Sequence, residues 1–167
     1  VGRVNKYTAY ALLGKVLLYQ DKFAEAASAL DNVIGVYSLV SDYGSQFLRF
    51  GENGPESVFE IQYSNQSNWY DWGCAHCSEG NYAIIMNGPR GWSGPEYAQG
   101  WSFNVPTEEF YNSFEEGDSR RDATVLDIEA FAAATGASYT EGYDHTGYFN
   151  NKYIPRAGES GLSLIHI

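Results

Sequence analysis

Residues 7–35 read YTAYALLGKVLLYQDKFAEAASALDNVIG, and this stretch sets the expected architecture of the chain. Apolar and small residues recur in it at the i, i+3, i+4, i+7 spacing of one helical face, in two successive runs. The first run is Tyr7, Tyr10, Ala11, Gly14, Leu17 and Leu18, and the second is Phe23, Ala26, Ala27, Leu30, Val33 and Ile34. A polar break separates them, and Gly35 follows the second run as glycine often follows a helix end. The sequence therefore predicts a helical hairpin whose helices approach closely at Gly14, Ala26 and Ala27.

This hairpin has the residue classes and offsets that are typical of a tetratricopeptide unit. The matching positions are Tyr10, Leu13, Gly14, Leu17, Phe23, Ala26, Leu30 and Val33. One such unit cannot bury its own faces, so we expect neighbouring units upstream of Val1. Because such repeats are mostly scaffold, we expect no catalytic residue within 1–36.

The composition limits the class of protein. The chain has 167 residues and a formal net charge of -11, from 10 Lys and Arg against 21 Asp and Glu. This length suits one domain with a real core, and a hydrophobic fraction of 44% excludes intrinsic disorder. The acidic balance argues against a nucleic acid or an anionic membrane surface as partner, because both attract basic proteins. An aromatic fraction of 16%, with 14 Tyr and 4 Trp, is the feature that a function has to explain.

After residue 36 the expected elements are shorter and less regular. Residues Ser57 to Tyr63 alternate as a strand, with Phe59, Ile61 and Tyr63 on one face. Residues 64–100 show no sustained period and predict a long loop, and a loop of that length is usually functional when it is ordered.

A helix is expected next, capped by Thr107 and ended by Gly117, with Phe110 and Phe114 as its buried stripe. The rest of the chain predicts a strand over 124–128, a short helix over 129–134 ended by Gly136, and a tyrosine-rich loop over 139–153.

Both ends of the sequence lead us to expect an internal fragment. The chain begins at Val1, without a Met and without a charged and then apolar leader. Residues 162–167 read LSLIHI, which looks like the translation of a sequencing adapter, the alternative being a natural strand-like end. We therefore leave 162–167 out of the fold reasoning as an adapter-derived artefact.

Four further motifs follow the hairpin in a fixed order. They are ESVFEIQY at 56–63, GWSFNVPT at 100–107, FEEGDSRRDAT at 114–124 and FNNKY at 149–153. With the hairpin before them, and over nearly all of residues 1–161, these motifs resemble the SusD/RagB family of Bacteroidetes outer-membrane nutrient-binding lipoproteins.

The resemblance implies a mainly α fold, with a tetratricopeptide-like hairpin and following loop at 1–50 and a loop-rich, truncated ligand-binding region with short strands at 51–161. It also implies a protein that is not an enzyme and has no cofactor. Such a protein binds oligosaccharides, or peptides in some members, on the outer surface of the cell and caps a SusC-like TonB-dependent transporter. The lipidated cysteine that anchors family members to the outer membrane has no counterpart here, so the membrane contact is only implied.

A sugar ring has an apolar C–H face that stacks on aromatic side chains, and a rim of hydroxyls that needs amides and carboxylates. The long loop offers both kinds of group. The candidate ligand-binding residues are Asn68, Trp69, Tyr70, Asp71, Trp72, Trp92 and Tyr97. Each ring has an alternative role, which is to pin the loop to the scaffold, and we expect that role for Trp101. Trp69, Tyr70 and Trp72 stand in a polar run without amphipathic period and are the foremost binding candidates.

Cys74 and Cys77 form a Cys-x-x-Cys pair. A zinc site would need two further ligands at similar spacing, which the sequence lacks, and a thioredoxin-like motif would need a βαβ context. We therefore expect no metal site and favour a local disulfide that tightens the loop, as an oxidising compartment would allow.

Hydrolysis of a glycan would need a pair of acids, one of them with a raised pKa. The carboxylates are plentiful around the 107–122 region, but they lie at expected helix ends and turns, and Asp118 is expected to form a cap or ion pair with Arg121. We expect no catalytic residue among them. The alternatives that stay open are a peptide receptor of the same family, a glycoside hydrolase-associated domain and a pure tetratricopeptide interaction scaffold.

Overall fold

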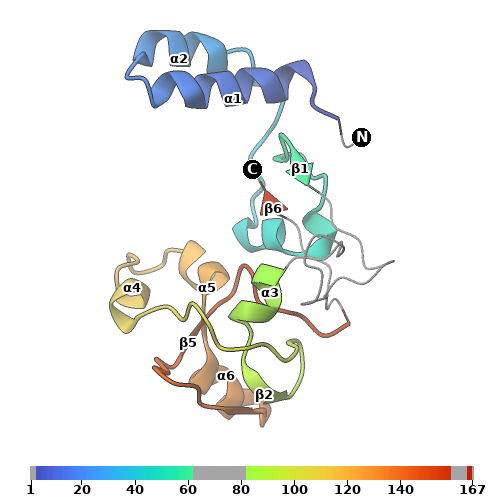
Figure 1. Cartoon of the computed structure of the whole chain (residues 1–167), viewed down its shortest axis with the longest axis vertical. Coiled ribbons are helices and arrows are strands. Elements are labelled where there is room, and N and C mark those ends of the chain that lie inside the picture. The colour runs from blue at the N-terminus through green and yellow to red at the C-terminus, as the bar shows by residue number, and fades with distance from the viewer. Residues whose placement is uncertain (1–2, 62–81, 159–164, 167) are drawn as a thin grey trace, which may run out of the picture.

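The first two helices form a hairpin at one end of the molecule (Figure 1). The structure is a computed structural model that describes residues 3–61, 82–158 and 165–166. Helix α1 spans Lys6–Leu18 and helix α2 spans Phe23–Leu30. A Cβ atom on Gly14 would lie 2.5 Å from Cγ of Leu30, so the predicted close approach at Gly14 is confirmed.

The second helix differs from the prediction at two points. It ends at Leu30, and Gly35, with φ of +80°, lies in the turns that follow rather than at the helix end. Ala26 and Ala29 are its buried residues, whereas Ala27 is exposed. The tetratricopeptide assignment stays a prediction, because a repeat is defined by the stacking of several units.

A middle region follows the hairpin. Its elements are the 3-10 helices η1 (Tyr43–Phe47) and η2 (Arg49–Gly51) and the strand β1 (Glu60–Ile61), which pairs antiparallel with β6 (Ile165–His166). The strand is shorter than predicted, and its buried residue is Glu60, whereas Ile61 is 41% exposed. Both carboxylate oxygens of Glu60 accept from the backbone N–H of Asn53 at 2.9 Å, which turns this acidic side chain inward. Tyr63 lies outside the described residues.

The lower body in Figure 1 holds the remaining elements. They are α3 (Tyr82–Asn87), β2 (Arg90–Ser93), α4 (Glu108–Asn112), α5 (Arg120–Thr124), β3 (Val125–Asp127), α6 (Ile128–Thr135), β4 (Ser138–Thr140) and β5 (Tyr148–Asn150). Strand β2 pairs antiparallel with β4, and β3 pairs antiparallel with β5 in the register Leu126↔Phe149.

The core of this body forms where β3, β5 and α6 meet. Ile128 is 0% exposed and Phe149 1% exposed, and both pack with Leu126, Tyr97 and Ile154. Burying apolar side chains of this size is the main source of folding free energy, so this cluster fixes the lower body.

The fold is therefore a mixture of helices and short antiparallel strands, so the expected fold class holds in part: the helical hairpin and the short strands are present, but the described residues are not mainly α. Residues 82–100, expected as loop, contain α3 and β2, and residues 139–153 contain β5 and part of β4. Strands of three or four residues are too short to show a period of two, and their partners lie far away in the sequence.

Two helix predictions hold in part or in full. Thr107 caps α4 by accepting from the N–H of Phe110 at 3.2 Å, but α4 ends at Asn112 and Phe110 is 46% exposed, so its predicted burial is wrong. Helix α6 ends at Gly136, with φ of +72°, as predicted. Within the described residues, no helix is long and apolar enough to cross a membrane.

Candidate ligand-binding site

The foremost predicted binding residues lie outside the described part of the chain. Asn68, Trp69, Tyr70, Asp71 and Trp72 all fall within 62–81, as do Cys74 and Cys77. Their proposed roles therefore stay predictions. Of the predicted site residues, Trp92 and Tyr97 can be placed.

Both of these rings pack on the core of the lower body. Tyr97 is 5% exposed and lies in the core cluster, and burial raises the pKa of its hydroxyl, an effect that the nearby Arg156 partly offsets. The ring of Trp92, which is half-buried, lies 5.9 Å from that of Tyr97, and Phe131 contacts both. In this arrangement both rings contribute to the packing of the lower body, and their role in ligand binding stays a prediction.

The GWSFNVPT motif forms a framework beside the end of α3. The backbone N–H groups of residues 100–103 donate to carbonyls of residues 85–89 at 2.7 to 2.8 Å. A Cβ atom on Gly100 would collide with Cα of Gly88, so only glycine allows this close approach of two backbones. Trp101 is half-buried, as expected of a framework residue, and its ring lies edge-on to Phe103 at 6.2 Å. The framework thus fastens the helix into which segment 62–81 leads.

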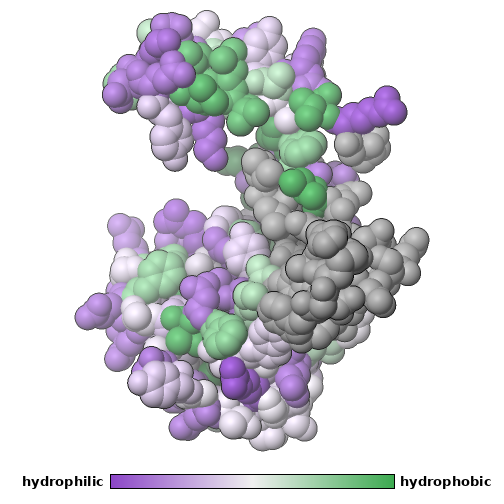
Figure 2. Space-filling model, viewed as in Figure 1, coloured by the Kyte–Doolittle hydropathy of each residue, from purple (hydrophilic) through white to green (hydrophobic). Residues whose placement is uncertain are grey.

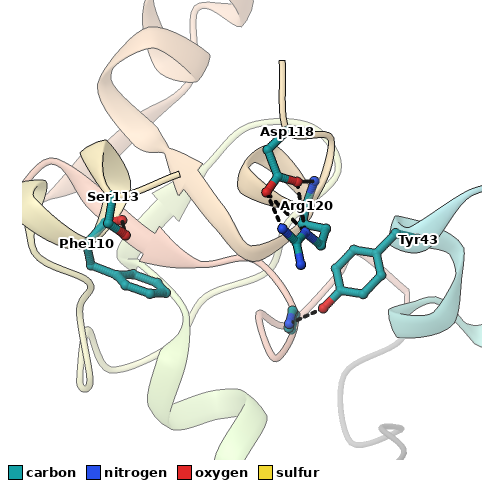
Figure 3. A network of polar contacts seen from close by, with 6 residues as sticks. Tyr43, Phe110, Ser113, Asp118 and Arg120 are labelled. Atoms are coloured by element: carbon teal, nitrogen blue, oxygen red, sulfur yellow. Dashed lines mark hydrogen bonds and ion pairs between the residues drawn. The ribbon is translucent and has the colours of Figure 1, made fainter. Parts of the chain in front are cut away.

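A partly open pocket of about 400 Å³ lies between η1 and the segment that joins α4 to α5 (Figure 3). We call it the Tyr43 pocket. Its lining combines aromatic rings, hydroxyls and charges of both signs, and consists of Tyr43, Phe110, Ser113, Phe114, Glu115, Asp118, Arg120, Thr124 and Lys152.

The rings of the Tyr43 pocket are braced by neighbouring rings. Phe110 lies edge-on to Phe114 with their centroids 5.3 Å apart, and Tyr43 lies edge-on to Phe47 at the same distance. Such pairs are worth about 0.5–1.5 kcal/mol beyond the area they bury, so each pair favours the observed orientation of its wall ring.

Lys152 joins the two sides of the pocket. Its Nζ donates to the hydroxyl of Tyr43 at 2.6 Å and lies 4.9 Å from the centroid of that ring and 4.7 Å from that of Phe47. A cation over aromatic faces is attracted by their π electrons, so this contact holds η1 against the chain just after β5. None of the pocket residues is among the ligand-binding residues predicted from the sequence, although the motifs FEEGDSRRDAT and FNNKY carry five of the charged and hydroxyl groups that line the pocket.

Comparison with known proteins identifies the fold. No protein-family model and no curated protein sequence matches the chain. Among solved structures, a laminarin-binding SusD-like protein is 36% identical over 99% of this chain, with a TM-score of 0.88. This chain has a SusD-like fold. Surface glycan-binding protein A from Bacteroides thetaiotaomicron, solved in complex with laminarihexaose, is 29% identical over 95% of the chain, with a TM-score of 0.84. The chain spans 41% of the first of these structures and 37% of the second.

Two carboxylates of the 107–122 region, those of Asp118 and Asp122, are paired with arginines. Asp118 pairs with Arg120, with Oδ2 and Nη2 2.6 Å apart, and accepts from the backbone N–H of Arg120 at 2.9 Å. The predicted pairing of Asp118 with Arg121 is wrong, because Arg121 pairs with Asp122 instead. The hydrogen bonds from Arg120 lower the pKa of Asp118 to about 2, so this carboxyl is ionised at neutral pH and cannot act there as a general acid.

The described residues hold no group of three or more metal-ligating side chains. The lining of the Tyr43 pocket offers a ligand aromatic rings, hydroxyl groups and charges of both signs.

Proposed function

We propose that this chain is the part of a cell-surface protein that binds an oligosaccharide and passes it, unchanged, to a TonB-dependent transporter of the outer membrane. The observation that carries the proposal is the similarity to a laminarin-binding SusD-like protein, at 36% identity and a TM-score of 0.88 over 99% of the chain. A relative in complex with laminarihexaose supports the same ligand class.

The proposed binding groups are Trp69, Tyr70 and Trp72, with Asn68 and Asp71 as hydrogen-bonding partners for sugar hydroxyls. The segment that carries them runs from β1 to α3, and the framework of residues 100–103 fastens the end of α3 by backbone hydrogen bonds. A site built from an apolar wall and a few placed polar groups suits a ligand that has both an apolar face and a hydroxyl rim.

Delivery needs a partner as well as a ligand. The proposed partner is a SusC-like TonB-dependent transporter, and the proposed attachment is a lipid anchor on the full protein. Co-purification of the full protein with such a transporter from outer membranes would support this part of the proposal. Consistent absence of the full protein from those membranes would contradict it.

Calorimetric titration with laminarihexaose and a panel of other oligosaccharides tests the binding proposal. We expect Trp69→Ala and Trp72→Ala each to weaken binding by roughly two- to tenfold, the loss of about one stacking contact. Tyr143→Ala is the matched control, because Tyr143 is 93% exposed and its removal opens no cavity.

Each other outcome contradicts a separate part of the proposal. Unchanged affinity in both tryptophan variants contradicts the site, and the absence of binding to every glycan contradicts the function. Release of shorter sugars during the titration would contradict binding without catalysis.

A further inference from the structure

We propose that the Tyr43 pocket is a second sugar site, which holds one or two units of a neutral oligosaccharide and is built from residues other than 68–72. The inference rests on the proposed function for its ligand class. The Tyr43 pocket is not among the binding sites predicted from the sequence. It is built from side chains of η1, α4, α5, the segment between α4 and α5, and the residues after β5.

The first reason is an aromatic wall that faces solvent. Phe110 packs edge-on with its neighbour Phe114 and is still 46% exposed, so one part of the side chain is covered and another part faces solvent. Figure 3 shows Phe110 and Ser113 on one side, and Asp118, Arg120 and Tyr43 on the other. A sugar that stacks its C–H face on Phe110 would therefore present its hydroxyl rim to polar groups.

The second reason is the balance of charge. The pocket lining holds two carboxylates, Glu115 and Asp118, and two cations, Arg120 and Lys152, whereas the whole chain carries a net charge of -11. Asp118 holds Arg120, and the ammonium of Lys152 donates to the Tyr43 hydroxyl above two rings. An anion or a cation would meet both signs of charge, while a neutral polyol can donate to the carboxylates and accept from the cations.

The third reason is size. A volume of about 400 Å³ lies toward the lower end of the roughly 300–1,000 Å³ that small-molecule sites span. The pocket thus has room for a terminal or branching unit of an oligosaccharide, with the rest of the ligand in solvent. Ser113 and Thr124 add hydroxyls at the same lining, which suits a ligand whose own groups are hydroxyls.

Amide NMR spectra of the chain, titrated with laminarihexaose and with an acidic oligogalacturonate, test the inference. We expect laminarihexaose to shift the amide signals of residues 110–120 and 152, and the oligogalacturonate to shift them less. Phe110→Ala should weaken the response of these signals by about two- to tenfold, the loss of one stacking contact. Phe50→Ala is the matched control, since Phe50 is 75% exposed and does not line the pocket.

The outcomes separate this inference from the proposed function. Binding that is lost in Trp69→Ala/Trp72→Ala, with no shift around the Tyr43 pocket, overturns the inference and leaves the function standing. A pocket response that Phe110→Ala and Phe50→Ala change equally also overturns it, and so does a stronger response to the oligogalacturonate. If no glycan shifts any signal, both proposals are overturned.

Discussion

Asp118 shows how one side chain can fix a turn. It accepts hydrogen bonds from the backbone and the guanidinium of Arg120, two residues further along, and so closes the start of α5. The carboxylate has a side-chain exposure of 13%, whereas Arg120 keeps 65% of its side chain exposed. Because solvent screens the guanidinium, the pair contributes modestly to stability and mainly sets the direction of the chain.

The lowered pKa of Asp118 predicts how stability depends on pH. The pKa is about 2 in the folded chain against an ordinary value of 3.8, so the pair stabilises the fold fully above about pH 4 and loses this effect as the pH falls toward 2. We expect Asp118→Asn to lower the Tm at neutral pH, and the difference from the parent to shrink between about pH 4 and pH 2. Thermal unfolding followed by circular dichroism measures this.

The control for that series is Glu116→Gln, which removes an exposed carboxylate two residues away. A Tm difference for Asp118→Asn that stays constant down to pH 2, or that Glu116→Gln reproduces, would show that the ion pair is not its source.

Among the secondary-structure elements, helices α1 and α2 differ in whether a side chain caps their N-terminal end. Oδ1 of Asn5 accepts from the N–H groups of Tyr7 and Thr8 at 2.8 and 2.9 Å, and so satisfies two donors at the start of α1. Helix α2 begins after Lys22, which makes no such bond. The hairpin thus contains one helix with a side-chain N-cap and one without, and the two can be compared.

We expect Asn5→Ala to lower the free energy of unfolding by about 1 kcal/mol, the usual effect of losing an N-cap. Lys22→Ala is the matched control and should change it by less than about 0.5 kcal/mol, as for an ordinary surface substitution. Urea denaturation of both variants measures the two values. Equal effects would mean that the cap of Asn5 does not stabilise α1.

The elements that the sequence predicted are those specified locally. The two hairpin helices, the Thr107 cap and the Gly136 helix end each depend on residues within a few positions. Strands β2 and β4 were missed because Arg90 pairs with Thr140, a partner that no local pattern reveals. The burial of Tyr97 was missed for the same reason, since its neighbours in the core come from β3, α6 and β5.

The candidate site shows the same limit. A polar, tryptophan-rich run can be seen in the sequence at 68–72, whereas the Tyr43 pocket is assembled from side chains as far apart as Tyr43 and Lys152. The sequence indicates that the charged groups around Asp118 belong to a turn. Only the three-dimensional structure shows that the ring of Phe110 lies on the other side of the pocket from them.

The whole molecule has two regions of different character. In Figure 2 the apolar colour gathers on the hairpin, and Leu12, Val16 and Leu18 are 59%, 44% and 50% exposed. The lower body instead surrounds a closed core around Ile128 and Phe149. Phe23 of α2 is 63% exposed as well. Apolar side chains exposed on both helices are typical of a hairpin that packs against further helices, which fits relatives more than twice as long as this chain.

The long-range strand pairs of the lower body have a consequence for the order of folding. Helices α1 and α2 are joined by four residues, whereas β3 must find β5 across a connection that contains α6 and β4. Closing long loops costs chain entropy before any contact compensates for it, so local structure forms faster. We expect pulsed hydrogen exchange during refolding to show protection of α1 amides before those of β3, and earlier protection of β3 would contradict this. Because Tyr43 and Lys152 are far apart in the sequence, the same argument predicts that the Tyr43 pocket forms late in refolding. The pocket would then become able to bind a sugar only after the hairpin helices have formed.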